Sequence, residues 1–378
     1  MILVPHKPKR NRRRTTTNPK SSSESKEDIL SDLPDSIIHH ILSFLETKQV
    51  FQTCVLSTRW NHLTKHLPTL KLCSEDFTSS DSFTKSVSQI MSSRDDSTPL
   101  HTLHFHDNNR FVESEVFESI VEYAVSHRVQ LLGITITCKD IQQFPSFLFS
   151  SQTLTSLHLT VGDDDGCKIL FPNSLNCPTL TTLTLRSFYF GAAGDDDGCA
   201  EPFSSFNRLH TLVIHNFILL PDAQILCISS TTLVNLTISG HEFYTNHSYI
   251  CKLSSPTLCN VSYTGILYQK PFCTHLCSVK HIYIDGRYIN HSVQHYSGIL
   301  LSWLLELANV KSLTISSNTL QVLHFLLLII SEFCEKCMTI HPNSPSSFVA
   351  FHRFSPSFLI YSRLNSLPCV TWSHCKSK

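Results

Sequence analysis

Two short motifs carry the residues of this chain that come closest to a metal-binding arrangement. GDDDGC occurs at 162–167 and again at 194–199, and its three adjacent carboxylates are of the kind that hold a hard cation. Both copies lack the alternating ligands and the distal Glu of an EF-hand loop. We therefore interpret them as acidic, glycine-bounded loops at the edge of a larger repeat.

Two cysteine pairs are the remaining candidates for metal or catalytic chemistry. CEKC at 334–337 and CTHLC at 273–277 could each supply two zinc ligands, but neither is followed by a second pair at suitable spacing. The chain also lacks a glycine-rich phosphate loop and the G-x-S-x-G nucleophile motif, and it contains only ten glycines. We predict no catalytic, metal or cofactor site and a protein that is not an enzyme.

Charge is distributed unevenly along the 378 residues, of which 41% are hydrophobic and 16% charged. This composition supports a sizeable core and two or three domains. Residues 1–20 carry seven basic residues and no acidic one, which leaves 23 basic against 30 acidic residues in the rest. An acidic body does not fit a duplex-binding surface, so we expect no nucleic-acid partner for the fold itself.

The first 27 residues are basic and rich in Ser, Thr and Pro without apolar periodicity, which predicts a disordered basic tail over 1–27. The apolar start is too short for a signal peptide. KPKRNRRR fits a nuclear localisation signal or a plain solvated tail, and we expect the nucleus and/or the cytoplasm. Fifteen cysteines without an export signal favour free thiols over a disulfide framework. The longest apolar run, at 322–330, is shorter than a membrane span, so we expect no membrane partner.

A repeated LxxLxL pattern, with apolar substitutions, organises the body of the chain. Its nine copies are spaced about 26 residues apart, within the range of leucine-rich repeats. The copies start at Leu100, Val129, Leu154, Leu180, Leu209, Leu233, Leu258, Val279 and Val310. Each copy predicts a short strand of a parallel sheet whose alternate apolar side chains enter a shared core, because no repeat can bury that face alone.

The two faces of this array can be predicted separately, the convex side from the segments between the strands and the concave side from the strands themselves. Val112–Ala124 has apolar residues at helical spacing and is expected to form a helix on the convex side, whereas later repeats are expected to have loops or short helical turns there. The polar residues that alternate with the core residues form the predicted concave face, which suits recognition of a protein or peptide. The candidate target-binding residues are His104, His106, His158, Arg186, His215, Tyr283 and Asp285.

Three short helices are predicted upstream of the repeats. The first has Pro34 in its first turn, the second spans roughly Lys48–Cys54 after Thr47 as cap, and the third begins after Ser57. The pattern LPD…IL.FL…VLS.RW across this segment resembles a plant F-box. The resemblance implies docking on the Skp-type adaptor of a cullin-based SCF ubiquitin ligase. The residues that it assigns to the interface or to internal packing are Leu33, Pro34, Ile37, Ile41, Leu42, Leu45, Val55, Leu56 and Trp60.

Together these segments resemble the plant F-box/LRR family, some members of which also carry a C-terminal FBD region. The resemblance implies an α/β chain: a three-helix F-box at 28–72, an irregular leucine-rich-repeat solenoid with a parallel sheet at 73–323, and an altered or truncated FBD-like ending at 324–378. It implies an adaptor that brings an unknown target protein to the ligase. The alternatives are a small-molecule-sensing receptor and an interaction protein whose basic tail binds nucleic acid.

Overall fold

The computed structural model describes most of the first two thirds of the chain and short pieces of the rest. The described residues are 32–107, 112–137, 141, 143–162, 168–173, 175–192, 198–240, 250–266, 278–287, 299–300, 303, 310–317, 319, 338–340, 349–351 and 369–373. The predicted basic tail, the three carboxylates of each GDDDGC motif and both cysteine pairs lie outside these residues.

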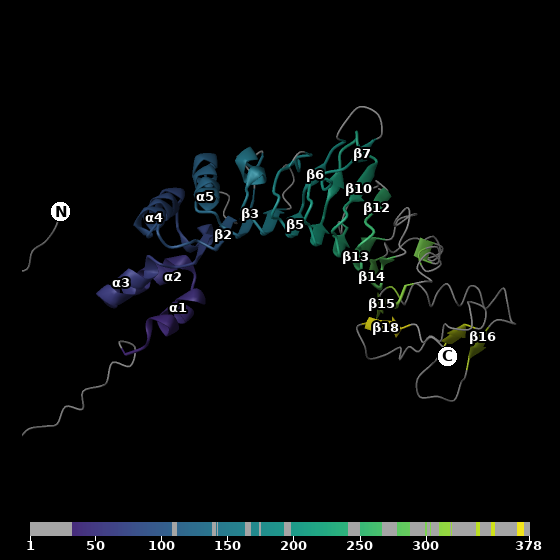
Figure 1. Cartoon of the computed structure of the whole chain (residues 1–378), viewed down its shortest axis with the longest axis horizontal. Helices are drawn as coiled ribbons and strands as arrows, with labels where there is room; N and C mark the ends of the chain where they lie inside the picture. Colours follow the sequence, from purple (N-terminus) through teal and green to yellow (C-terminus); the bar gives the residue numbers. More distant parts are fainter. Residues whose placement is uncertain are drawn as a thin grey trace, which may run out of the picture.

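Three short helices form the first unit, as the sequence predicts, and they lie at one end of the molecule (Figure 1). They are α1 (Asp35–Ser43), α2 (Thr47–Gln52) and α3 (Thr58–Thr64), with a 3₁₀ turn, η1 (Thr53–Val55), between the last two. The predicted cap of the second helix is wrong by one residue. Glu46 is the N-cap, and its N–H donates to the side chain of Gln49. Thr47 is the first residue of the helix, and its hydroxyl accepts a hydrogen bond from the backbone N–H of Lys71.

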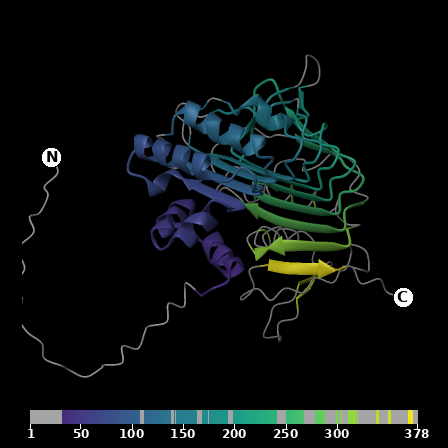
Figure 2. The same ribbon diagram turned by 60° about the vertical axis from the view of Figure 1, so that its left-hand side comes forward.

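Eleven strands follow in one large sheet, the main sheet, which curves along the molecule (Figures 1 and 2). In spatial order they are β1 (Thr69–Cys73), β2 (Thr102–Asp107), β3 (Leu131–Ile136), β4 (Ser156–Val161), β5 (Thr182–Arg186), β8 (Thr211–His215), β11 (Asn235–Ser239), β13 (Asn260–Ile266), β14 (His281–Arg287), β15 (Ser312–Ser316) and β18 (Cys369–Ser373). All neighbours pair in parallel except β15 and β18, which are antiparallel. The nine predicted strands are confirmed as β2, β3, β4, β5, β8, β11, β13, β14 and β15.

β1 was not predicted, although it carries the same pattern. LPTLKL at 67–72 is an LxxLxL copy that coincides with the end of the F-box signature, so it was assigned to the F-box at 28–72 and not to the repeats. Thr69–Cys73 pairs in register with Thr102–His106 of β2. The last residues of the F-box segment are therefore also the first strand of the repeat array.

Two rows of apolar side chains run across the main sheet and fill its core. The strands pair without a shift, so equivalent positions align from β1 to β15. One row is Leu70, Leu103, Leu132, Leu157, Leu183, Leu212, Leu236, Val261, Ile282 and Leu313, and the other is Leu72, Phe105, Ile134, Leu159, Leu185, Ile214, Ile238, Tyr263, Ile284 and Ile315. All of them are buried, and each contributes about 1.5–3 kcal/mol by leaving water.

The outer side of the arc is covered differently along its length. α4 (Ser80–Ser93) and α5 (Ser114–Ser126) cover the first repeats (Figure 1), and α5 confirms the predicted helix. A 3₁₀ turn, η3 (Ser146–Ser150), follows. Later repeats instead carry short parallel strands, so the expectation of loops and helical turns there was wrong in part. These strands are β6 (Tyr189–Phe190), β7 (Cys199–Ala200), β9 (Ile218–Leu219), β10 (Ile225–Ser229) and β12 (Ile250–Ser254).

One expectation about the cysteines is also corrected on this outer side. A disulfide joins Cys199 of β7 to Cys227 of β10, whose Cα atoms lie 6.2 Å apart on neighbouring strands. Strand pairing between repeats brings these two residues together, which their separation in the sequence could not show.

Phenylalanine rings fill the space between the main sheet and its outer layer. They contact one another from Phe83 of α4 through Phe105 and Phe117 to Phe217, with neighbouring ring centroids 5.6–6.4 Å apart. Phe188 and Phe217 occupy the place where regular leucine-rich repeats have Asn or Cys. Both rings are buried, so aromatic packing occupies the position that Asn or Cys takes in regular leucine-rich repeats.

The described C-terminal pieces are short strands. β16 (Met338–Ile340) and β17 (Val349–Phe351) pair with each other, and β18 adds to the edge of the main sheet.

Replacing Phe188 with Ala should lower the free energy of unfolding by about 3–5 kcal/mol, because the buried ring contacts Phe144 and Phe171 and would leave a cavity. Urea denaturation followed by circular dichroism measures the change. Leu170→Ala, at an exposed neighbouring position, is the control and should change stability by less than about 0.5 kcal/mol. Equal effects of the two variants would contradict the aromatic packing described here.

Candidate functional site

The three-helix unit has a small core of its own. Six buried side chains meet there: Ile38, Leu42, Val50, Trp60, Leu63 and Leu67, with Leu33 and Leu45 packed against them. Ser57 caps α3 by accepting a hydrogen bond from the N–H of Trp60, which holds this indole at the start of its helix. Leu42 and Trp60 therefore stabilise the unit and are not available on its surface.

A second apolar stripe on α1 faces outward. Ile38, Leu42 and Leu45 recur at intervals of four and three residues and turn toward the core. Ile37, Ile41 and Phe44 have the same spacing one residue earlier, and 43% of Ile37 and 71% of Phe44 are exposed. A helix needs only one apolar stripe to pack on its own domain, and the ring contact that Phe44 of the outer stripe makes is with His40 of the same helix.

The turn between α2 and α3 exposes two more apolar side chains. Val55 is 87% exposed and Leu56 is 58% exposed. Arg59, three residues later, donates hydrogen bonds to the backbone oxygen of Leu33 and to the carboxylate of Asp35. These bonds tie the start of α3 to the start of α1, so the Val55–Leu56 turn and the first turn of α1 lie at the same end of the unit.

The structure thus divides the nine predicted F-box residues into three groups. Leu42 and Trp60 are buried, Leu33, Ile41 and Leu45 are half-buried, and Pro34, Ile37, Val55 and Leu56 are exposed. Phe44 is an exposed apolar residue that the sequence reading missed. Its signal was its place seven residues after Ile37, on the same side of the helix. The exposed residues, Pro34, Ile37, Phe44, Val55 and Leu56, together with the half-buried Ile41, are called the outer patch below.

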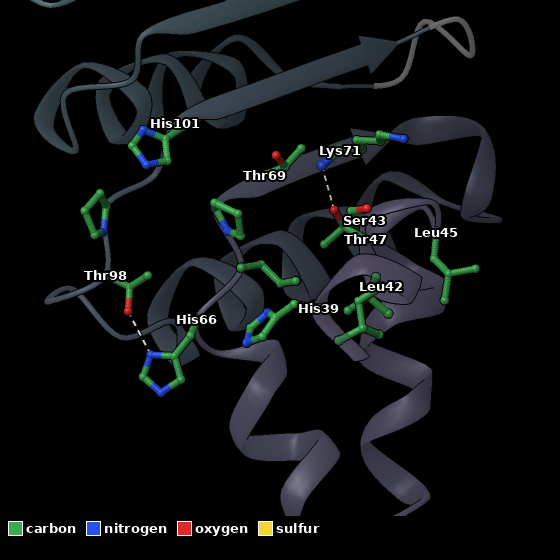
Figure 3. A pocket seen from close by; sticks show the side chains of 14 residues that line it. His39, Leu42, Ser43, Leu45, Thr47, His66, Thr69, Lys71, Thr98 and His101 are labelled. Atoms are coloured by element: carbon green, nitrogen blue, oxygen red, sulfur yellow. Dashed lines mark hydrogen bonds between the residues drawn. The ribbon is translucent and has the colours of Figure 1, made fainter. Parts of the chain in front are cut away.

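A hollow of about 300 Å³ lies where this unit meets the main sheet (Figure 3). Its lining includes His39 and Leu42 of α1, Thr69 of β1 and His101 before β2. The hydroxyl of Thr47 beside it accepts a hydrogen bond of 2.6 Å from the backbone N–H of Lys71. Because β1 is an edge strand, this bond satisfies a donor that would otherwise lack a strand partner and joins α2 to the sheet.

The opposite side of the main sheet from the aromatic core is the polar face, and it carries all seven predicted target-binding residues. His104 and His106 are on β2, His158 on β4, Arg186 on β5 and His215 on β8, while Tyr283 and Asp285 share β14. They alternate with the buried rows, so they all point to the inner side of the arc. Their role in binding a target stays a prediction.

Three histidines on this face are held in the neutral form more strongly than free histidine. Loss of water around the ring, together with the nearby charges of His158 and Lys71, lowers the pKa of His104. Burial lowers the pKa of His158, and burial together with the Arg186 charge lowers the pKa of His215. Gly133 lies between His104 and His158 in register, and a Cβ there would come within 2.4 Å of the His104 Nδ1.

Side-chain hydrogen bonds join polar residues farther along the polar face. Asn260 donates to Asn235, and Asn235 to Thr211, in a ladder across β13, β11 and β8. Asp285 accepts a hydrogen bond from Ser316.

Two of the described free thiols, those of Cys177 and Cys251, are buried. Burial raises the pKa of Cys177 to about 11 and that of Cys251 to about 12, so both stay protonated and are poor nucleophiles.

Comparison with known proteins matches the helical unit to a characterised domain. Residues 30–72 match the F-box domain family. An F-box/LRR-repeat protein of Arabidopsis thaliana is 28% identical over 317 residues, which cover 79% of this chain and 64% of the relative. A second F-box/LRR-repeat protein of the same plant is 26% identical over 79% of this chain and 80% of the relative. The chain carries an F-box domain and is similar along most of its length to F-box/LRR-repeat proteins of a plant.

A third relative carries in its name the C-terminal region expected above. An FBD-associated F-box protein of Arabidopsis thaliana is 28% identical over 58% of this chain and 46% of its own length. The chain thus spans 64% of the length of the first of these relatives and 46% of the third, less than two thirds of either. Among the helices that the structure describes, none has the length and apolar character to cross a membrane.

The depressed histidine pKa values predict that acid destabilises the F-box protein. The unfolded chain takes up protons at His104, His158 and His215 at higher pH than the folded chain does, so the free energy of unfolding should fall between about pH 7.5 and 5.5. Urea denaturation at both pH values measures the fall. The double variant His104→Gln, His158→Gln should lose less stability than the wild type. An equal loss would show that these rings titrate as they do in the unfolded chain.

Proposed function

We propose that this protein is a non-catalytic substrate adaptor of an SCF ubiquitin ligase. The F-box would dock on a Skp-type adaptor and, through it, on a cullin, while the polar face of the main sheet would hold a target protein for ubiquitination. The adaptor would raise the rate by proximity, since it holds the target near the ubiquitin-charged enzyme. Action in the nucleus and/or the cytoplasm is part of the same proposal.

The observation that carries this proposal is the outer patch of the F-box. Phe44 and Val55 are mostly exposed although they are large and apolar, and the F-box already has a complete core without them. Clustered exposed apolar side chains mark surfaces that are covered by a partner. The match to the F-box family supports a Skp-type adaptor as that partner.

The relatives support the proposed role of the main sheet in holding a target protein. Their names pair an F-box with leucine-rich repeats, the arrangement found here as three helices followed by the main sheet. A curved, open array of strands offers an extended surface that suits a protein ligand.

The docking surface can be tested with single substitutions. Val55→Asp should weaken binding of the full-length protein to a purified Skp-type adaptor by about 30-fold or more, because it places a charge in an apolar interface at a cost of about 2 kcal/mol. Isothermal titration calorimetry measures the affinity. The thermal unfolding midpoint should stay unchanged, since Val55 contributes nothing to the F-box core.

Two further variants separate the interface from the fold. Leu170→Asp introduces the same charge at an exposed position of the repeat array and should bind the adaptor like the wild type. Leu42→Ala should lower the stability of the F-box by about 2–5 kcal/mol, because Leu42 lies in its core. Wild-type affinity of both Val55→Asp and Ile37→Asp would show that the outer patch is not the docking surface.

A further inference from the structure

The end of the polar face nearest the F-box carries a group of basic side chains. Lys71 is on β1, His104 and His106 on β2, His158 on β4, Arg186 on β5 and His215 on β8. These six residues are called the basic end below. From β1 through β13 no position on this face of the described strands is Asp or Glu; Asp285, on β14, is the first.

Few carboxylates of the described residues approach the basic end from neighbouring elements. Glu46 lies 3.8 Å from the Lys71 ammonium, and Glu75 and Asp76 follow β1 beside Cys73. Asp107 is buried on the other side of the sheet, where Ser74 donates to it. Acidic groups therefore gather at β1, where Glu46 also acts on His104 of β2, while the described positions of β4, β5 and β8 on this face carry imidazoles and a guanidinium but no carboxylate.

We propose that the basic end binds an acidic, extended segment of the target protein. The proposal rests on the proposed function, because it names the kind of segment that the polar face would recognise. Carboxylates of the segment would supply the negative charge that this part of the face lacks. Arg186, which is exposed, can hold a carboxylate through two parallel hydrogen bonds, and each imidazole can donate one.

The dimensions of the basic end fit a short peptide. The six residues span β1, β2, β3, β4, β5 and β8, which are consecutive in the sheet. Five strand spacings amount to about 24 Å, the length of about seven extended residues. Gly133, between His104 and His158 in register, lets the His104 ring lie over the backbone of β3, because a Cβ there would come within 2.4 Å of its Nδ1.

Binding of such a segment should depend on pH. His104 faces Lys71, Glu46 and His158, and His215 faces Arg186, so positive charges outnumber negative ones around both rings. A bound carboxylate would offset this repulsion and favour protonation. By linkage, the segment should then bind more tightly as the pH falls through the range where histidine titrates.

A protein ligand fits these charges better than a nucleic acid does. Only Lys71 and Arg186 are charged at every pH in this range, whereas nucleic-acid binding usually rests on many phosphate contacts. Outside the first 20 residues the chain is also net acidic, which would repel a long polyanion.

The test uses the full-length protein and a fluorescein-labelled peptide of about eight residues that alternates Glu with Ser. Fluorescence anisotropy should give a Kd below about 1 mM that tightens about tenfold from about pH 7.5 to pH 6. The matching Gln–Ser peptide should bind at least about tenfold more weakly and without pH dependence.

Arg186→Gln should weaken binding of the Glu peptide about tenfold, and His104→Gln should remove much of its pH dependence. Thr237→Ala, on β11 of the same face, is the control and should bind like the wild type. Gly133→Ala should also weaken binding, because its methyl group displaces the His104 ring without changing the chemistry of either histidine.

Three results would overturn the inference: equal affinities for the Glu and Gln peptides, wild-type affinity of Arg186→Gln, and tighter binding of a single-stranded DNA oligonucleotide that displaces the peptide. Titration of the same preparation with a Skp-type adaptor separates this inference from the proposed function. Adaptor binding without discrimination between the peptides would defeat the inference alone, whereas peptide discrimination without adaptor binding would defeat the proposed function.

Discussion

In-register stacking of the apolar rows is the constraint on which the rest of the structure depends. A single strand with its loops cannot bury Leu103 or Leu185, whereas the same side chains are fully covered between neighbouring repeats. Because core residues take every second position of each strand, the residues between them must point to the other face. The packing that buries Leu103 and Leu185 therefore also presents His104 and Arg186 on the polar face.

The repeat array could be read from the sequence because its spacing is local, whereas features that depend on distant pairing could not. Apolar residues at intervals of three and two marked nine strands. β1 was not recognised because its copy of the pattern spans two cores: Leu67 belongs to the core of the F-box, and Leu70 belongs to the core of the main sheet. The short outer strands and the Cys199–Cys227 bridge arise only once repeats are stacked. Ile37 and Ile38 are the same residue type, so sequence alone could not show which one faces outward.

The F-box and the main sheet are joined by hydrogen bonds and not only by the chain. Thr47 accepts from the backbone of Lys71, and Arg94, after α4, donates to the backbone oxygens of Leu67 and Thr98. Arg94 is buried, so these bonds form out of water, where leaving a donor unpaired costs most. In the proposed function this junction fixes the position of the docking surface relative to the face that holds the target.

The central claim is that the F-box binds a Skp-type adaptor through its outer patch while the polar face stays free for a target. Hydrogen–deuterium exchange of the full-length protein, with and without a purified Skp-type adaptor, tests it most directly. The account predicts slower exchange in 33–45 and 53–57 when the adaptor is bound, and unchanged exchange in β2, β4, β5 and β8. Slower exchange in those strands, or no change in α1 and the Val55–Leu56 turn, would contradict it.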